Sequence, residues 1–170
     1  MATASGGKNK ILAVACNTHD RGGGGLTFTT VGVRHLRFWT LSRGRLTSKK
    51  GIYTGVPPGS RTMLCVAYTD PTHDTARPEI TLTGSKDGKV YIWKDNKACK
   101  AVSALEGPIF DMVVVGDQIA IGGKDKQAPL RILSLPRGWP AQVDLVQRTG
   151  MHPDKDGHSR AGAGRQFCVR

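Results

Sequence analysis

The sequence predicts an all-β fold built from repeated units of about four strands each. One observation is a stretch at 31–41 that runs from a glycine through a short turn to an aromatic end, and that returns at 83–95 and, in weaker form, at 121–133. A second is that Gly is abundant, with 22 residues, whereas aromatic residues make up only 6% of the chain. A third is that no segment shows sustained helical periodicity. These features are typical of short strands joined by Gly-rich turns and repeated along the chain.

The repeat is wider than this one stretch. Trp39 and Trp93 lie 54 positions apart, and the same step carries Thr18-His19-Asp20 onto Thr72-His73-Asp74. Trp93 and Leu133 lie 40 positions apart, which is close to the usual length of a blade in a WD-repeat propeller. The sequence therefore predicts a WD-repeat β-propeller with about three four-stranded blades.

The chain divides at punctuated connectors. We expect a disordered start at 1–9, blades at 10–54, 55–106 and 107–149, and a Gly-rich linker at 150–170 that carries the first strand of a further blade. The predicted strands are 11–16, 26–31, 36–41 and 46–53; then 62–68, 79–84, 90–93 and 98–105; then 109–115, 118–122, 130–135 and 143–146. Three blades cannot close a propeller ring. We therefore expect a fragment of a larger or tandem propeller, or a ring that another chain completes.

The formal net charge of +12 predicts attraction to an acidic partner: nucleic acid, anionic lipid or an acidic protein surface. The basic residues are dispersed along the chain, so each one could also serve only to discourage aggregation at a strand edge. A nucleic-acid partner is disfavoured because no basic run is interleaved with exposed aromatic residues.

The cysteines and the N-terminus point to a reducing, cytosolic setting. Cys16, Cys65, Cys99 and Cys168 lie far apart without a Cys-x-x-Cys pair, so we expect free thiols and no zinc site. The N-terminus lacks the apolar core of a signal peptide, and no run approaches 18 apolar residues. We expect no membrane segment.

Several Trp, Asp and His residues could belong to a functional site, but a structural role accounts for their positions better. Trp39 and Trp93 are expected to pack between blades, because an aromatic residue at a repeat position usually packs. Asp87 and Asp125 are expected to cap tight turns by accepting backbone N–H groups. The His-Asp pairs at 19–20 and 73–74 lie in different blades, which does not favour a metal site. The sequence predicts no catalytic residues, no cofactor site and no metal site.

The run Gly-Val-Arg-His-Leu-Arg-Phe-Trp-Thr-Leu at 32–41, followed by Leu-Thr-Ser-Lys-Lys-Gly-Ile-Tyr at 46–53, closely resembles the echinoderm microtubule-associated protein-like (EMAP-like) family. The segments 84–93 and 107–125 are similar to later blades of the family, and the resemblance covers about 10–147. It implies WD-type repeats in a tandem pair of atypical propellers, association with microtubules and, in many related proteins, a place in ciliary axonemes. The three expected blades depart from standard WD repeats in lacking their Gly-His dipeptide and, in the third, in carrying Leu133 in place of a Trp.

The functional surface is expected to be the loops. Turns between the second and third strands of each blade should gather on one propeller face, and turns between the third and fourth strands on the opposite face. The first set carries Arg34, His35, Lys86, Lys89, Lys124 and Lys126; the second carries Arg43, Arg45, Lys97 and Arg137. One of these faces is expected to meet the acidic surface of tubulin in the cytoplasm, the cytoskeleton or an axoneme, possible partners being tubulin or other axonemal proteins. The alternative is a WD-repeat adaptor that binds another protein and never contacts tubulin.

Overall fold

The computed structural model describes residues 7–18, 25–57, 59–69, 80–126 and 129–134, and the backbone of 146–148. Several predictions fall outside these residues: the His-Asp pairs at 19–20 and 73–74, Arg137, and the strand expected within 150–170. The described residues include no helix of the length and apolarity that crossing a membrane requires.

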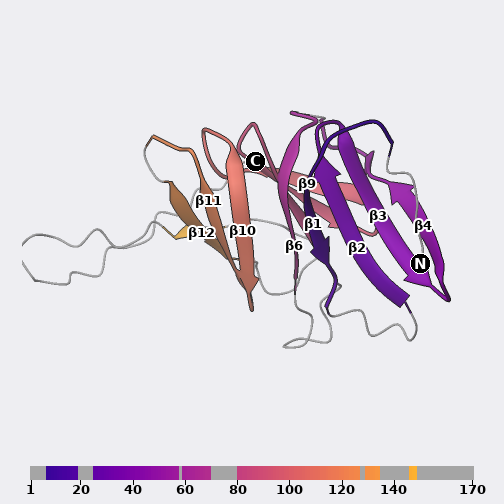
Figure 1. Cartoon of the computed structure of the whole chain (residues 1–170). Helices are drawn as coiled ribbons and strands as arrows, with labels where there is room; N and C mark the ends of the chain where they lie inside the picture. Colours follow the sequence, from indigo (N-terminus) through magenta and orange to yellow (C-terminus); the bar gives the residue numbers. More distant parts are fainter. Residues whose placement is uncertain are drawn as a thin grey trace, which may run out of the picture.

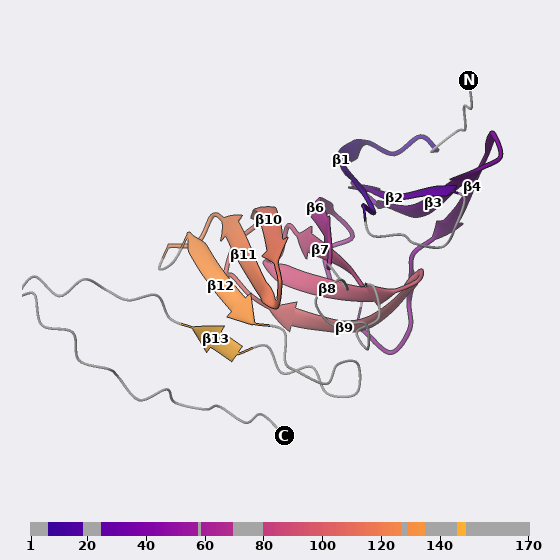
Figure 2. The same ribbon diagram turned by 90° about the horizontal axis from the view of Figure 1, so that it is seen from below.

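The described chain folds into three β-sheets that follow one another in sequence order (Figure 1). The first sheet contains β1 (Ile11–Cys16), β2 (Gly25–Gly32), β3 (His35–Ser42) and β4 (Arg45–Lys50). The second contains β5 (Ile52–Tyr53), β6 (Met63–Tyr68), β7 (Thr81–Ser85), β8 (Lys89–Lys94) and β9 (Lys97–Ser103). The third contains β10 (Ile109–Val115), β11 (Gln118–Gly123), β12 (Leu130–Ser134) and β13 (Val146–Arg148). Each sheet is an antiparallel meander apart from the β5–β9 pairing, and Figure 2 shows that the sheets lie one beside the next without closing a ring. The predicted blade architecture is confirmed, and we call the sheets blades 1, 2 and 3.

The inner strands β1, β6 and β10 are interrupted at equivalent positions. Each inner strand carries an irregularity at the same place, between Ile11 and Ala13, between Met63 and Cys65, and between Ile109 and Asp111. A bulge bends its strand and increases the local twist. Repetition of the same bulge in every blade shows that these are copies of one unit, a feature that the residue pattern did not reveal.

The strand predicted at 46–53 is wrong as a single element. It ends at Lys50, and Ile52–Tyr53 instead pairs in parallel with β9 of blade 2. The physical cause is the contact at Gly51, where an added Cβ would lie 2.4 Å from Leu36 Cδ2, so that the chain passes tightly between the blades. The N–H of Ile52 then donates to the carbonyl of Asn96 at 2.8 Å, which fixes the chain on the next blade.

Blade 2 is covered on both faces. Val90 and Ile92 pack in an apolar cluster with residues of blade 3, whereas Tyr91 and Trp93 pack in a second cluster with residues of blade 1. All four residues of 90–93 are therefore buried, because a middle blade has a neighbour on each side. The core of the described chain lies in the two spaces between its blades.

Candidate functional site

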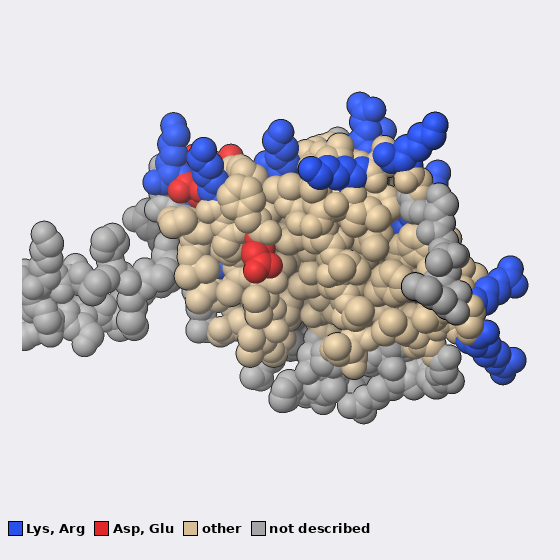
Figure 3. Space-filling view, viewed as in Figure 1, with Lys and Arg blue, Asp and Glu red and all other residues tan. Residues whose placement is uncertain are grey.

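One edge of the described blades carries the turns that join each second strand to the third. These turns are Val33–Arg34 between β2 and β3, Lys86–Gly88 between β7 and β8, and the segment from Lys124 to Pro129 between β11 and β12. Lys and Arg side chains gather along this edge, at the top of Figure 3, with some acidic side chains among them, while the middle of the same view is mostly uncharged apart from one acidic patch. We call this edge the turn edge; backbone hydrogen bonds from Val33 to Lys10 and from Arg34 to Arg61 bring two further cations to it.

Most of the predicted cations of the first set lie at the turn edge. Arg34 is exposed and adopts a φ of 51°, the left-handed conformation that a tight hairpin turn demands. Lys86, Lys124 and Lys126 are exposed in the turns, and Lys89 begins β8 with its amine 4.0 Å from Asp87. Arg43 and Arg45 lie at the β3–β4 turn, which is a different end of the blade, so the two predicted sets are separated in space.

His35 does not lie on the surface. Only 5% of the residue is exposed, and its Nε2 lies 2.8 Å from the hydroxyl of Thr30. That hydroxyl accepts the indole N–H of Trp39 at 2.8 Å, so its own proton is available to a neutral imidazole. Burial, followed by the charge of Arg37, lowers the pKa of His35 below its ordinary value. His35 is therefore a neutral, structural residue of blade 1, and the expectation of a contacting role at the loop surface is not supported by its position.

Asp87 and Asp125 accept backbone N–H groups as predicted, and these N–H groups belong to neighbouring connections. The carboxylate of Asp87 accepts the N–H of Ser60 at 3.0 Å and the hydroxyl of Ser85, and Asp125 accepts the N–H of Glu106 at 3.1 Å. Partial burial raises the pKa of Asp87, but the hydrogen bonds from Ser85 and Ser60 outweigh it and hold the pKa below its ordinary value. The turn edge keeps an excess of positive charge because its Lys and Arg residues outnumber these two carboxylates.

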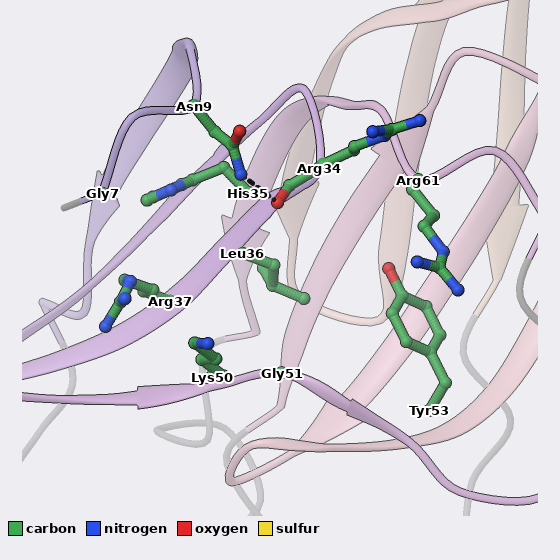
Figure 4. Close-up of a pocket in the computed structure, with 10 residues that line it drawn as sticks. All are labelled: Gly7, Asn9, Arg34, His35, Leu36, Arg37, Lys50, Gly51, Tyr53 and Arg61. Carbon is green, nitrogen blue, oxygen red and sulfur yellow. Dashed lines mark hydrogen bonds between the residues drawn. The ribbon is translucent and has the colours of Figure 1, made fainter.

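A cavity of about 630 Å³ opens beside the turn edge, between blades 1 and 2 (Figure 4). Its described lining is Gly7, Asn9, Arg34, His35, Leu36, Arg37, Lys50, Gly51, Tyr53 and Arg61. Four of these residues are Arg or Lys, and none of the described lining residues is Asp or Glu. The volume lies within the range of ligand sites in proteins.

The cations approach this cavity from two sides. Arg37 and Lys50 are directly opposite each other across β3 and β4, on one side in Figure 4. On the other side the guanidinium of Arg61 lies beside the hydroxyl of Tyr53. Burial, followed by Tyr91, raises the pKa of Tyr53 to about 12, so this hydroxyl keeps its proton. The cavity therefore presents cations and a hydrogen-bond donor around an uncharged floor formed by Leu36 and Gly51.

Of the cavity cations, sequence reasoning selected only Arg34. A signal for two others was present: the Arg43-Gly44 pair, with φ values of 48° and 75°, forms a two-residue turn that fixes Arg37 opposite Lys50. No comparable signal marked Arg61, because the connection that brings it to the cavity is irregular.

The chemistry available at this surface is charge and shape. Among the described residues, no three His, Cys, Asp or Glu side chains gather as a possible metal site. Burial raises the pKa of Cys65 to about 12, so this thiol stays protonated between blades 2 and 3, while Cys16 and Cys99 are exposed free thiols. This arrangement suits the binding of an anionic partner.

No protein-family model matches the chain. Among solved structures, the β-propeller domain of Myceliophteria thermophila Cps50 (Swd1) is similar with a TM-score of 0.59 and 11% identity, over 82% of this chain and 46% of that one. Among curated proteins, the 77 kDa echinoderm microtubule-associated protein of Strongylocentrotus purpuratus is 33% identical over 106 residues, and human echinoderm microtubule-associated protein-like 1 is 31% identical over 103 residues. The chain contains an EMAP-like WD-repeat region.

The matches to these two relatives cover 59% and 58% of this chain. The chain in turn spans only 14% and 12% of their lengths, so the EMAP-like region corresponds to a small part of each. The likeness to the solved propeller shows the fold alone.

Proposed function

We propose that this EMAP-like region is a non-enzymatic scaffold that associates with microtubules through its turn edge. The observation that carries the proposal is the gathering of Arg34, Lys86 and Lys124, one from each blade, on a single edge. The carboxylates of Asp87 and Asp125 at the same edge are tied to backbone N–H groups. Support also comes from the names of the relatives, which describe them as microtubule-associated.

An edge of this kind acts through long-range attraction. Exposed cations on short turns give little affinity individually, because water and salt screen them. Together they raise the rate of encounter with an acidic surface and orient the chain upon it. The acidic surface of tubulin is the partner we propose, and binding should therefore weaken as the salt concentration rises.

Co-sedimentation with microtubules over a salt series tests this proposal. Between about 0.05 and about 0.3 M salt the Debye length shrinks severalfold, and we expect the bound fraction to fall steeply. A chain denatured before mixing serves as the control for nonspecific pelleting. Binding that is indifferent to salt, or no binding at the lowest salt, would contradict the proposal.

We also propose a location on cytoskeletal microtubules, including those of ciliary axonemes. Imaging of the tagged chain in ciliated cells, before and after depolymerisation of cytoplasmic microtubules, separates the two populations. A signal that is diffuse under both conditions and absent from cilia would reject both locations.

A second candidate function is that of a WD-repeat adaptor with no contact to tubulin. It is favoured by the outward face of blade 3, where Phe110, Val113, Val115, Leu130 and Ile132 are exposed. Exposed apolar patches of this kind mark protein contact surfaces. A tubulin pull-down against a tag-only control distinguishes this function from the first, and a gel shift with arbitrary duplex tests the disfavoured nucleic-acid partner.

A further inference from the structure

The cavity between blades 1 and 2 places like charges together without an acid among its described lining. Arg37 and Lys50 are Cα partners on adjacent strands, and like charges directly opposite each other destabilise a sheet. On the far side, the N–H of Arg34 donates to the carbonyl of Arg61 at 2.8 Å, which holds the two backbones together, and in Figure 4 the Arg61 guanidinium turns toward Tyr53 while the Arg34 side chain points away from it. Such an arrangement costs free energy unless an anion neutralises it.

The cavity is also built before any ligand arrives. The Nη1 of Arg37 donates to the hydroxyl of Ser48 at 2.9 Å, and its guanidinium lies 5.9 Å from the ring centroid of Trp39. Asn9 donates its side-chain N–H to the carbonyl of Arg34 at 3.0 Å. Because these contacts limit the freedom of the lining, less conformational entropy is lost when a ligand binds.

The spacing of the cations favours an extended ligand over a single small ion. In Figure 4 the side chains of Arg37 and Lys50 lie on one side of Leu36, and those of Tyr53 and Arg61 lie on the other. Because the two groups lie on opposite sides of Leu36, an extended ligand can meet both, and an extended acidic peptide carries carboxylates at intervals along its length. Arg side chains recognise carboxylates through two parallel hydrogen bonds.

We propose that this cavity binds an acidic peptide segment, with one carboxylate at Arg37 and Lys50 and another at Arg61. Leu36 contacts the aliphatic part of the segment between them, and the Tyr53 hydroxyl donates to it. The proposal rests on the proposed function, because the acidic segment is taken to belong to the microtubule surface.

Fluorescence anisotropy tests this inference on the whole chain with a labelled peptide of about ten Glu residues, and with a Gly-Ser peptide of the same length as control. The variant Lys50→Gln with Arg61→Gln removes one exposed cation from each side. We expect it to bind the acidic peptide about tenfold more weakly than the unaltered chain, as expected for lost charge-assisted hydrogen bonds. Arg37 is left in place because it also packs on Trp39.

The matched control is Arg43→Gln with Arg45→Gln, which removes the same charge from the β3–β4 turn and should leave affinity within about twofold. An equal loss in both variants would show a nonspecific charge effect and overturn the inference. If inorganic phosphate displaces the labelled peptide when added at the same concentration of negative charge, the cavity is a phosphate site, and this result would also overturn the inference.

The peptide assay and the microtubule assay fail independently. A chain that pellets with microtubules but does not bind the acidic peptide refutes the cavity proposal and leaves the proposed function standing. A chain that binds the peptide through Lys50 and Arg61 but does not pellet refutes the proposed function and leaves an acidic-peptide site of another partner. Thermal unfolding of both variants confirms that they retain the fold of the unaltered chain.

Discussion

Blades 1 and 2 carry the same tryptophan–threonine pair in different surroundings. In blade 1 the indole N–H of Trp39 donates to Thr30, whose hydroxyl lies against the imidazole of His35. In blade 2 the indole N–H of Trp93 donates to Thr83 at 2.9 Å, and the Thr83 hydroxyl lies 3.6 Å from the sulfur of Met63. The hydrogen bond from the indole N–H to the threonine hydroxyl thus recurs in both blades. The group beside that hydroxyl is a titratable imidazole in blade 1 and a thioether in blade 2.

The two pairs also differ in what covers them. Trp93 is 0% exposed, and the rings of Phe38 and Tyr53 lie 5.8 and 5.1 Å from it, so that it joins two blades. Trp39 is 6% exposed and stacks on Phe28 of its own blade at 5.9 Å. In blade 3 the equivalent positions hold Leu133 and Ile121, and the polar pair is replaced by an apolar one. The tryptophan at this position therefore stabilises the contact between blades 1 and 2 when it is Trp93, and the sheet of blade 1 alone when it is Trp39.

The largest difference between the blades should come from Trp93→Ala and Trp39→Ala. Removing a buried tryptophan typically costs about 3–5 kcal/mol, and we expect Trp93→Ala to lie in this range because it empties the space between two blades. Trp39→Ala should cost less, since its main ring contact lies within one sheet. Urea unfolding followed by circular dichroism measures both. Equal losses would show that Trp93 does not join the blades.

The turns of the two blades should also respond differently. Gly88 has a φ of 77°, and an added Cβ would lie 2.0 Å from the carbonyl oxygen of Leu105. Gly88→Ala should therefore destabilise the chain by about 1–3 kcal/mol through strained backbone. Arg34→Gly, at the corresponding turn of blade 1, relieves a left-handed residue and should change stability by no more than about 1 kcal/mol. Thermal unfolding of both variants decides the point, and a tolerated Gly88→Ala would contradict the close contact.

Thr83→Val tests the indole–hydroxyl bond itself. The substitution keeps the shape of the side chain but leaves the buried N–H of Trp93 without its acceptor, at a cost of about 1–3 kcal/mol. Leu133→Ile, in the blade without this bond, is the control for altering a core side chain of similar volume and should cost less than about 1.5 kcal/mol. If chemical denaturation shows no loss for Thr83→Val, the bond does not stabilise blade 2.

The smallest effect should be a pH dependence that belongs to blade 1. Folding lowers the pKa of His35 below its ordinary value of 6.5. As the pH falls below 6.5, the unfolded chain therefore binds more protons at this residue than the folded chain does. This contribution to stability is complete above pH 6.5 and is lost as the pH falls through the lower pKa of the folded state. His35→Gln should reduce the difference between urea midpoints measured near pH 7.5 and near pH 5, whereas Met63→Leu should leave it unchanged. An undiminished difference in His35→Gln would contradict a neutral buried imidazole.

Repetition in the sequence was enough to predict the blades, because strand, turn and tryptophan recur at similar spacing. That Asp87 and Asp125 accept backbone N–H groups followed from the hydrogen-bonding habits of aspartate. That the donors, Ser60 and Glu106, lie in neighbouring connections did not follow. The burial of His35 did not follow, because its partners depend on the β2–β3 register that places it beside Thr30. The transfer of Ile52–Tyr53 to blade 2 was equally hidden, since it depends on contact between blades. The blade boundaries chosen within the connectors stay predictions.

The site could be predicted only in part. The cations of the turns were visible as short basic stretches between strands. Which of the two sets faces a partner could not be predicted, because it depends on how the turns of different blades come together in the fold. Arg61 entered the candidate cavity through an irregular connection that no local pattern describes. Side chains brought together by tertiary packing leave little trace in local sequence, whereas strands and turns do.

A microtubule co-sedimentation experiment with two matched charge variants tests the central claim most directly. One variant carries Lys86→Glu with Lys124→Glu at the turn edge, and the other carries Arg43→Glu with Arg45→Glu at the β3–β4 turn. The two variants change the net charge equally, so only the position of the charge differs. The account predicts that the first loses binding at low salt by about tenfold or more while the second binds within about twofold of the unaltered chain. Equal binding by both variants, or a greater loss in the second, would contradict it.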